Sequence, residues 1–383
     1  PGAPASAETD KPASNAAEPG KSTPAPPPEE TEVTAKKVPA QAPGSPPETP
    51  PASTPAGAKP GAQAEAFTAE IEKKKAWAKA ASEKIQAAFF TYEDNDFLVH
   101  STLPASSREM KLLLFNLKGL KKTIAVVIGV SGSARIWPDK LQLVLLKSEP
   151  EYERFANMVD AIQSAKNPEG AYTSGSHSVL LSPDSDALAR ILGETALRRL
   201  NGSEKWVAWW LEQGVAELVF AQSPAGQKKE HYANTIKYAA DVIKAEGETL
   251  KIFNLLETPS YKDKDSTRNR ALALSLVHFL LKKSQGGFHD LIKTLKSDAA
   301  PAPPPADSKS KEEFNAFHLS YISFQEKAIE SSFRMSLSAI QERWKAFTLQ
   351  SAEAIKAQET AEEKKKQQQQ QDQNKAKKGP SGS

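Results

Sequence analysis

Two stretches decide which fold the sequence predicts: "ARILGETALRRL", residues 189–200, and "WVAWWLEQGVAEL", residues 206–218. The first has the apolar spacing of an amphipathic helix, and the second continues as another helix. Glu194 lies second in the five-residue window 193–197. Residues 193 and 197, at the two ends of this window, lie four apart and so share one helical face. Both the expected fold and the expected chemistry depend on these two segments.

The ends of the chain differ from its middle in composition. More than half of the 28 prolines lie in the first 60 residues, a segment without Leu, Ile, Met or any aromatic residue. Such a segment cannot bury enough apolar surface to offset the entropy of ordering. We therefore predict a disordered Pro/Ala-rich linker over 1–62 and a disordered Lys/Gln-rich tail over 363–383. About 300 residues remain between them, which is enough for a sizeable core.

Charge and cysteine content exclude several classes of protein. The chain has 50 basic and 47 acidic residues, a balance that argues against a dedicated nucleic-acid binder. The cluster of Lys118, Lys121 and Lys122 is most simply a solvated helix face. The absence of cysteine excludes disulfide scaffolds, cysteine-zinc sites and thiol nucleophiles. No apolar run approaches the roughly 18 residues that cross a membrane, so we predict no integral membrane segment.

Strands are expected only in the first half of the core. The stretch "FFTYEDNDFLVHSTLP", 89–104, predicts a strand or hairpin, and "KLQLVLLKS", 140–148, predicts a buried strand. "GAYTSGSHSVLLSPD", 170–184, predicts two short strands about a Ser-Gly-Ser turn. The segment from 108 can begin as a helix, but its β-branched residues at 123–128 leave helix and strand open there.

This order of elements predicts an α+β fold, a small sheet with flanking helices followed by a mainly helical subdomain. From about residue 186 the pattern is helical, apart from the proline-rich run near 300. The expected organisation between the disordered ends is an N-terminal helix over 63–88, an α+β region over 89–222, a helical subdomain over 223–299, a Pro-rich linker over 300–310 and C-terminal helices over 311–362.

In this order the segments resemble the gluzincin-type peptidase-MA-like domains of bacterial envelope proteins, from about 90 to 222 and more weakly to 350. The Trp-Leu-x-x-Gly-x-Ala-Glu segment is the most specific part of this resemblance. Most of the support for the resemblance comes from the order of the other segments. The resemblance implies a gluzincin metallopeptidase-like fold, in which two His on one helix and a Glu on the next hold zinc. The matching stretches are "TYEDNDFLVHSTLP", "LQLVLLKSEPEYERFA", "GAYTSGSHSVLLSP", "LGETALRRL" and "AWWLEQGVAELVF".

The residues that the resemblance assigns to zinc are replaced. Gly193 and Leu197 stand at the two His positions, and Gln213 stands at the Glu position. Glycine and leucine offer no ligand, and a neutral amide is a poor ligand for zinc. Glu194 keeps the position of the water-activating residue, although an ion pair with Arg198 one turn later is a sufficient structural reason for it. We therefore predict no metal, no cofactor and no catalytic residue.

Other residues could still line a former cleft. Moving the third-ligand position to Glu212 does not restore the missing His residues. The imidazole of His231 lies outside the first helix, and tryptophans of the second helix are expected to pack between helices. The residues that could line the cleft are Glu217, His177, Tyr172 and Trp210.

Three functions remain open. The leading hypothesis is a catalytically inactive peptidase-like domain that binds or scaffolds protein or peptide, with "GAYTS", 170–174, as an edge strand for an extended peptide. The alternatives are an active hydrolase with a rearranged site that uses Glu194 and a purely structural envelope protein. A removed export signal followed by a Pro/Ala-rich tether would look like the start of this sequence, and so would an arbitrary starting point. Together with the resemblance to bacterial envelope proteins, it leads us to expect a periplasmic or secreted protein of the bacterial cell envelope.

Overall fold

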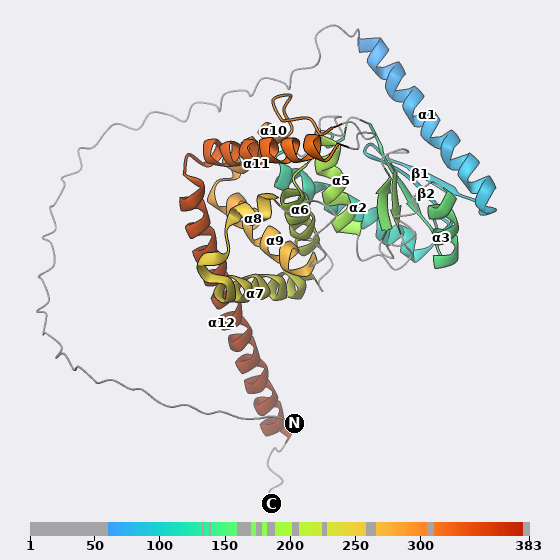
Figure 1. Cartoon of the computed structure of the whole chain (residues 1–383). Helices are drawn as coiled ribbons and strands as arrows, with labels where there is room; N and C mark the ends of the chain where they lie inside the picture. The colour runs from blue at the N-terminus through green and yellow to red at the C-terminus, as the bar shows by residue number, and fades with distance from the viewer. Residues whose placement is uncertain are drawn as a thin grey trace, which may run out of the picture. The chain divides into compact units, whose positions relative to one another are not determined.

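The structure, a computed structural model, describes residues 60–131, 134–137, 139–158, 170–173, 178–181, 188–200, 207–223, 228–257, 266–304 and 310–377. Within these ranges it is an α+β protein, with a mixed sheet followed by helices, as the sequence predicts (Figure 1). Of the expected linker over 1–62, residues 60–62 begin the first helix, and the rest lies outside the described ranges. No helix of the described residues is long and apolar enough to span a bilayer.

The sheet has five strands in the order β1-β2-β3-β5-β4. The three central strands run parallel, and each edge strand is antiparallel to its neighbour. The hairpin expected within 89–104 and the strands expected within 140–148 and 170–184 are all present. The strands are β1 (Phe90–Glu93), β2 (Phe97–Ser101), β3 (Leu141–Leu145), β4 (Gly170–Thr173) and β5 (Ser178–Leu181).

Helices cover both faces of the sheet. Successive residues of β3 belong to different hydrophobic clusters, Leu143 to the larger and Val144 to the smaller, because side chains alternate across a strand. The smaller cluster includes residues of α1 (Pro60–Ile85) and α3 (Glu149–Met158), on the outer side of the sheet in Figure 1. The larger cluster includes residues of α2 (Arg108–Ile128) and α5 (Leu188–Arg198). The sheet therefore lies between two helical layers.

The stretch whose structure the sequence left open, 123–128, is helical and completes α2. Ser107 caps the start of α2 by accepting a hydrogen bond from the Met110 amide at 3.1 Å, and Gly129 ends it in the left-handed conformation. Ile124 and Ile128 are buried in the larger core. Burial of these side chains outweighs the weak helix propensity of β-branched residues.

The second half of the described chain is helical. Its centre is α6 (Trp209–Ala221), whose residues are buried on every side from Trp210 onward. The Trp210 indole donates a 2.8 Å hydrogen bond to Gln325, so it packs between helices and does not line a cleft. The other elements are α7 (Lys228–Glu246), the 3-10 helix η2 (Gly247–Thr249), α8 (Ile252–Glu257), α9 (Ser266–Lys283), α10 (Gln285–Leu295), α11 (Lys311–Phe333) and α12 (Leu337–Lys377).

One hydrophobic cluster crosses the boundary that the sequence analysis places between 222 and 223. It joins Leu143 of β3, Leu197 of α5, Val215 of α6, Val277 of α9 and Trp344 of α12. The α+β region and the helical subdomain consequently share a core. The Pro-rich segment expected over 300–310 has no regular structure at 301–304, and 305–309 lie outside the described residues.

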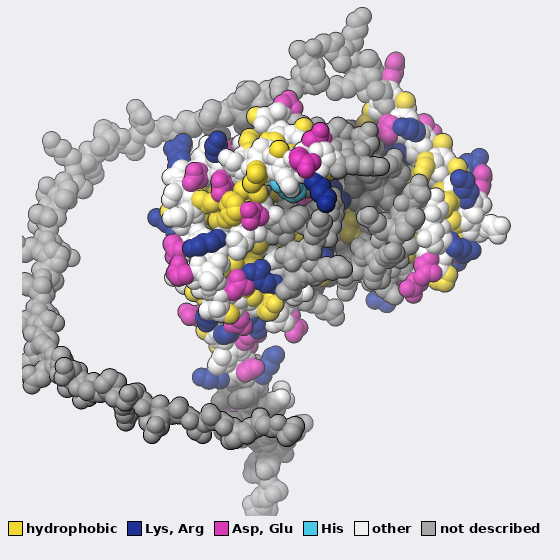
Figure 2. Space-filling view, viewed as in Figure 1, with side chains coloured by type: hydrophobic (Ala, Val, Ile, Leu, Met, Phe, Trp, Pro, Cys, Tyr) yellow, Lys and Arg dark blue, Asp and Glu magenta, His cyan; other side chains and the backbone are white. Residues whose placement is uncertain are grey.

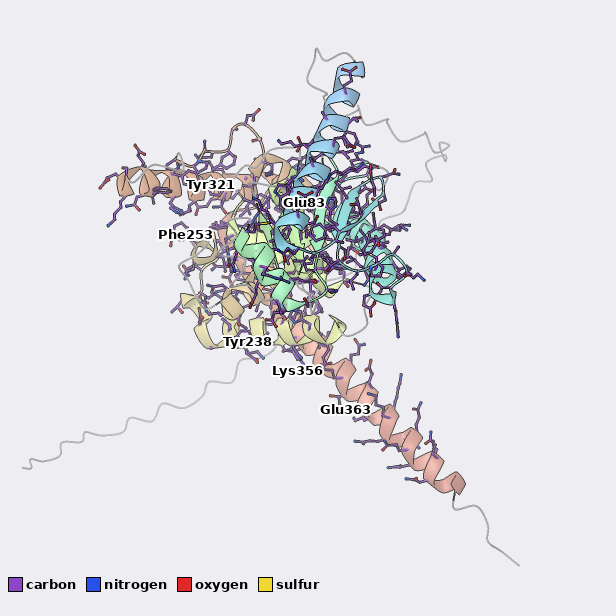
Figure 3. The ribbon with its side chains drawn as sticks, turned by 90° about the vertical axis from the view of Figure 1, so that its right-hand side faces the viewer. Glu83, Tyr238, Phe253, Tyr321, Lys356 and Glu363 are labelled. Atoms are coloured by element: carbon purple, nitrogen blue, oxygen red, sulfur yellow. The ribbon has the colours of Figure 1, made fainter. Side chains whose placement is uncertain are left out.

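The prediction of a disordered tail from 363 is wrong as far as Lys377, where α12 ends. Lys and Gln dominate this stretch, and both are good helix formers. Side chains from Lys356 to Asn374 are exposed, so this part of α12 stands away from the core, as Figures 1 and 3 show. Polar composition was a sound reason to expect no core there, but not to expect an absence of helix.

A buried ion cluster ties α1 to the end of α5. The Asp139 carboxylate contacts the Lys74 ammonium, and its other oxygen lies 2.6 Å from an Arg199 nitrogen. Lys74 and Arg199 are almost fully buried. Burial alone would raise the pKa of Asp139, but the hydrogen bond from Lys74 and the charge of Arg199 outweigh it and hold the pKa below its usual value. The cluster therefore depends on an ionised carboxylate.

Candidate functional site

Helices α5 and α6 approach so closely at Gly193 that no side chain fits between them. A Cβ atom built on Gly193 would lie 2.8 Å from the Cα of Ala216, a distance that real Cβ atoms essentially never show. On the far side of α6, a Cβ on Gly214 would lie 2.6 Å from the carbonyl oxygen of Ala273 in α9. Glycine at both contacts lets three helices pack backbone against backbone. The position that the resemblance assigns to the first His is thus a helix-packing contact.

The second His position points into the core. Leu197 is fully buried and belongs to the larger hydrophobic cluster. A polar imidazole there would lose its hydration without a designed partner. Gly193 and Leu197 are therefore both explained by packing, and neither fits a zinc ion.

The structure brings Glu194 and Gln213 together. The Gln213 amide nitrogen donates a 3.0 Å hydrogen bond to a Glu194 carboxylate oxygen. The amide oxygen of Gln213 is buried and has no hydrogen-bond partner among the described residues. The two positions to which the resemblance assigns the third ligand and the water-activating residue are thus in direct contact through this hydrogen bond. These residues do not fit the zinc site that the resemblance implies.

Arg198 binds Glu212 more closely than Glu194. Its Nε atom donates to Glu212, whereas its nearest approach to Glu194 is 4.0 Å. The expected one-turn pair of Glu194 and Arg198 is present, but it is the longer of the two. Burial raises the pKa of Glu194, and burial together with the charge of Glu194 raises that of Glu212 to about 7, although Arg198 opposes both shifts. Two carboxyl groups share one guanidinium, so the pair retains a proton to higher pH than ordinary carboxyls.

Because the Glu194–Glu212 pair retains a proton, we expect the stability of the fold to depend on pH. A carboxyl group with a higher pKa in the folded than in the unfolded chain stabilises the fold at low pH and loses that contribution as pH rises through the folded pKa. The Glu212 contribution is therefore complete below about 4.5, its unfolded value, and fades as pH rises through about 7. We expect the melting temperature to fall between pH 6.5 and 8 and to fall less in Glu212→Gln, as measured by calorimetry.

The pH range from 6.5 to 8 separates the effect of Glu212 on the melting temperature from the effect of the buried histidines. Burial lowers the pKa of His100 and His278 to about 4, so their linkage acts between about 4 and 6.5 and is complete above it. Glu246→Gln is the matched control, because the pKa of Glu246 is lowered by its hydrogen bond from Arg268. If the melting temperature fell equally between pH 6.5 and 8 in the wild type, Glu212→Gln and Glu246→Gln, the shared proton would be contradicted.

A second polar cluster lies one turn away, later in α6 at Glu217 and earlier in α5 at Arg190. The Glu217 carboxylate is almost fully buried, 2.8 Å from Arg190 through one oxygen and 2.8 Å from His231 Nε2 through the other. Burial alone would raise the pKa of Glu217, but the His231 hydrogen bond and the Arg190 charge hold it below its usual value. Arg190 also stacks over the Phe220 ring at 4.5 Å. Glu217 is thus fixed by two partners and serves α5, α6 and α7 as an ionic link.

A cavity of about 300 Å³ opens beside this second cluster. Besides the cluster it is lined by residues of α7 and α9, among them Thr235, Tyr238 and Arg270. Glu217, which the sequence indicates as a possible cleft residue, lines this cavity. Arg190 and Arg270 were not expected there, although Arg190 lies three residues before Gly193 and so shares its helical face.

The remaining candidates come from the sheet. Tyr172 lies on β4 opposite Val179 of β5, and β4 is an edge of the sheet, as expected for 170–174. Helix α5 contacts both β4 and β5. His177 lies outside the described residues. The end strand β4 and the α5–α6 helix pair are therefore adjacent parts of the fold.

Comparison with known proteins adds no relative. The chain matches no protein-family model, and no curated protein is significantly similar to it. Across the described part of the chain, no three His, Cys, Asp or Glu side chains are grouped so that they could hold a metal ion. Function must therefore be argued from the site alone.

Proposed function

We propose that this protein is a catalytically inactive, gluzincin-like domain of the bacterial envelope that binds extended peptide segments of other proteins. The observation that carries the proposal is the replacement of the ligand set by contacts that hold the fold together. Gly193 packs on Ala216, Leu197 fills the core, and Gln213 donates to Glu194. A site that keeps its helical frame while each ligand position serves packing is suited to binding and not to metal-assisted hydrolysis.

The edge strand β4 supports the choice of an extended peptide. β4 is antiparallel to β5 on one side, and no described strand pairs with its other side. Such an edge offers main-chain donors and acceptors to an added strand. Because α5 contacts β4, a peptide added there would run next to the helix that carries Gly193 and Glu194.

Two alternatives have less support. A rearranged hydrolase would need Glu194 to activate water, but its carboxylate accepts the Gln213 hydrogen bond and lies near Arg198. A purely structural role would assign no use to the side of β4 with which no described strand pairs.

Proline substitution on β4 tests the proposal. Adjacent residues of an antiparallel strand direct their N–H groups to opposite sides, so Ala171→Pro and Tyr172→Pro affect opposite edges. One variant should interrupt pairing with β5 and lower the melting temperature by several degrees. The other should melt like the wild type but lose binding to peptides selected by the wild-type protein from a random displayed library.

Ala171→Ser and Tyr172→Ala control for the side chains, and both should keep peptide binding. Titration of a labelled selected peptide measures the affinities. Undiminished binding by the thermally silent proline variant would contradict pairing at β4. Failure of the wild type to select any peptide would contradict the peptide-binding function itself.

A further inference from the structure

Helix α2 leaves an apolar stripe in solvent. Its buried face contributes Leu117, Ile124 and other residues to the larger core. On the opposite face, Phe115 is 70% exposed, Val126 is 58% exposed and Leu112 is 56% exposed. Scattered exposed apolar residues are ordinary, but here three large ones share a single helix face, with Leu112 and Phe115 within one turn of each other and Val126 about three turns farther along.

Basic residues share the same face. Arg108, Lys111, Lys118 and Lys122 are all exposed. At about 100° per residue, these four and the three apolar residues fall on one arc of about 120°. The acidic residue of the first turn, Glu109, lies outside the arc. Elsewhere, on the side that Figure 2 shows, Lys, Arg, Asp and Glu are interspersed. The arc therefore combines one sign of charge with exposed apolar side chains.

The structure divides the lysine cluster that the sequence analysis treated as a solvated face. Lys121 turns toward the sheet and forms an ion pair with Asp96. Lys118 and Lys122 remain exposed, both on the same side of the apolar residues. A merely solvated face would carry charge without large apolar residues, so solvation does not explain this arrangement.

We propose that this face of α2 binds the surface of an anionic lipid bilayer, with the helix lying in the plane of the interface. The apolar side chains would enter the boundary between headgroups and acyl chains, and the cations would contact lipid phosphates and carboxylates. From Arg108 to Val126 the arc is about 27 Å long, at about 1.5 Å per residue. The proposal is independent of peptide binding at β4.

Charge favours a lipid surface over a second copy of the chain. In a symmetric dimer through this face, the four cations of one arc would oppose the four cations of the other. An anionic bilayer supplies negative charge and an apolar interior over the whole length of the arc. Surface lysines near such a bilayer each strengthen binding about fivefold.

Vesicle sedimentation with the full chain tests the proposal. The probes are vesicles of phosphatidylcholine alone and of phosphatidylcholine with about a third phosphatidylserine. We expect binding to the anionic vesicles, weakened by high salt. The double variant Lys118→Glu, Lys122→Glu should bind at least about 25-fold more weakly, and Phe115→Ser about tenfold more weakly. Both variants change exposed side chains, so their melting temperatures should match the wild type.

Leu319→Ser and Lys311→Glu on α11 are the matched controls. Leu319 is 67% exposed, close to the exposure of Phe115, and Lys311 is also exposed. Both controls should bind like the wild type. The proposal is overturned if the wild type does not bind anionic vesicles, if it binds neutral vesicles equally, or if the α2 variants bind like the controls. Self-association that disappears in Phe115→Ser, without vesicle binding, would instead assign the face to a dimer.

Discussion

A Gly193→Ala variant is expected to lose about 2 kcal/mol of unfolding free energy, although alanine is ordinarily the better helix former by about 1 kcal/mol. The reason is steric: the new Cβ would lie 2.8 Å from the Cα of Ala216, and a backbone atom cannot move aside alone. Helices α5 and α6 would have to separate. Gly193→His, which restores the first ligand of the resemblance, should cost still more. Chemical denaturation monitored by circular dichroism measures both.

Gly286→Ala is the matched control for the glycine experiment. Gly286 also lies in a helix, α10, but nothing lies within 4 Å of a Cβ built there. We expect Gly286→Ala to be neutral or to stabilise the protein by up to about 1 kcal/mol. If Gly193→Ala stabilised the protein by the same amount, the close crossing of α5 and α6 would be wrong.

An Asp139→Ala variant is expected to lose about 3–5 kcal/mol, the largest effect among the charged residues considered. It would leave Lys74 and Arg199 without their shared carboxylate, and these side chains are only 4% and 7% exposed. An unpaired buried charge keeps its desolvation cost and loses its compensation. Equilibrium urea unfolding gives the change directly.

Glu93→Ala is the control for the buried ion cluster. Glu93 also contacts two lysines, Lys75 and Lys140, but its side chain is 34% exposed. Such a pair contributes about 0–1 kcal/mol, so the variant should stay close to the wild type. Similar losses in Asp139→Ala and Glu93→Ala would show that burial does not set the cost.

Local patterns in the sequence predicted most of the elements. The strand at 140–148 and the hairpin within 89–104 follow from alternation and turn residues, and both are confirmed. Where the local pattern left the structure open or predicted it wrongly, burial in the tertiary structure determines it. The end of α2 is helical because Ile124 and Ile128 are buried, and the boundary at 222 disappears because one core crosses it.

The candidate site could be located from the sequence but not explained from it. Spacing showed which positions lacked ligands, and the structure brings Glu194 and Gln213 within a hydrogen bond. The reason for Gly193 is a contact with Ala216 on another helix, which residue spacing within one helix cannot reveal. Likewise, the nearest partner of Arg198 is Glu212 across the helix pair, although Glu194 is its neighbour in sequence. Contacts between helices, and not patterns along them, explain the residues that stand at the positions the resemblance assigns to zinc.

The zinc content of the purified full chain tests most directly the proposal that the positions assigned to zinc by the resemblance serve packing instead. The protein is incubated with excess zinc, desalted and measured by elemental analysis. Because Gly193 and Leu197 are engaged in packing and Gln213 in a hydrogen bond, we expect far less than one zinc ion per chain. One tightly held zinc ion per chain would contradict the proposed inactive site.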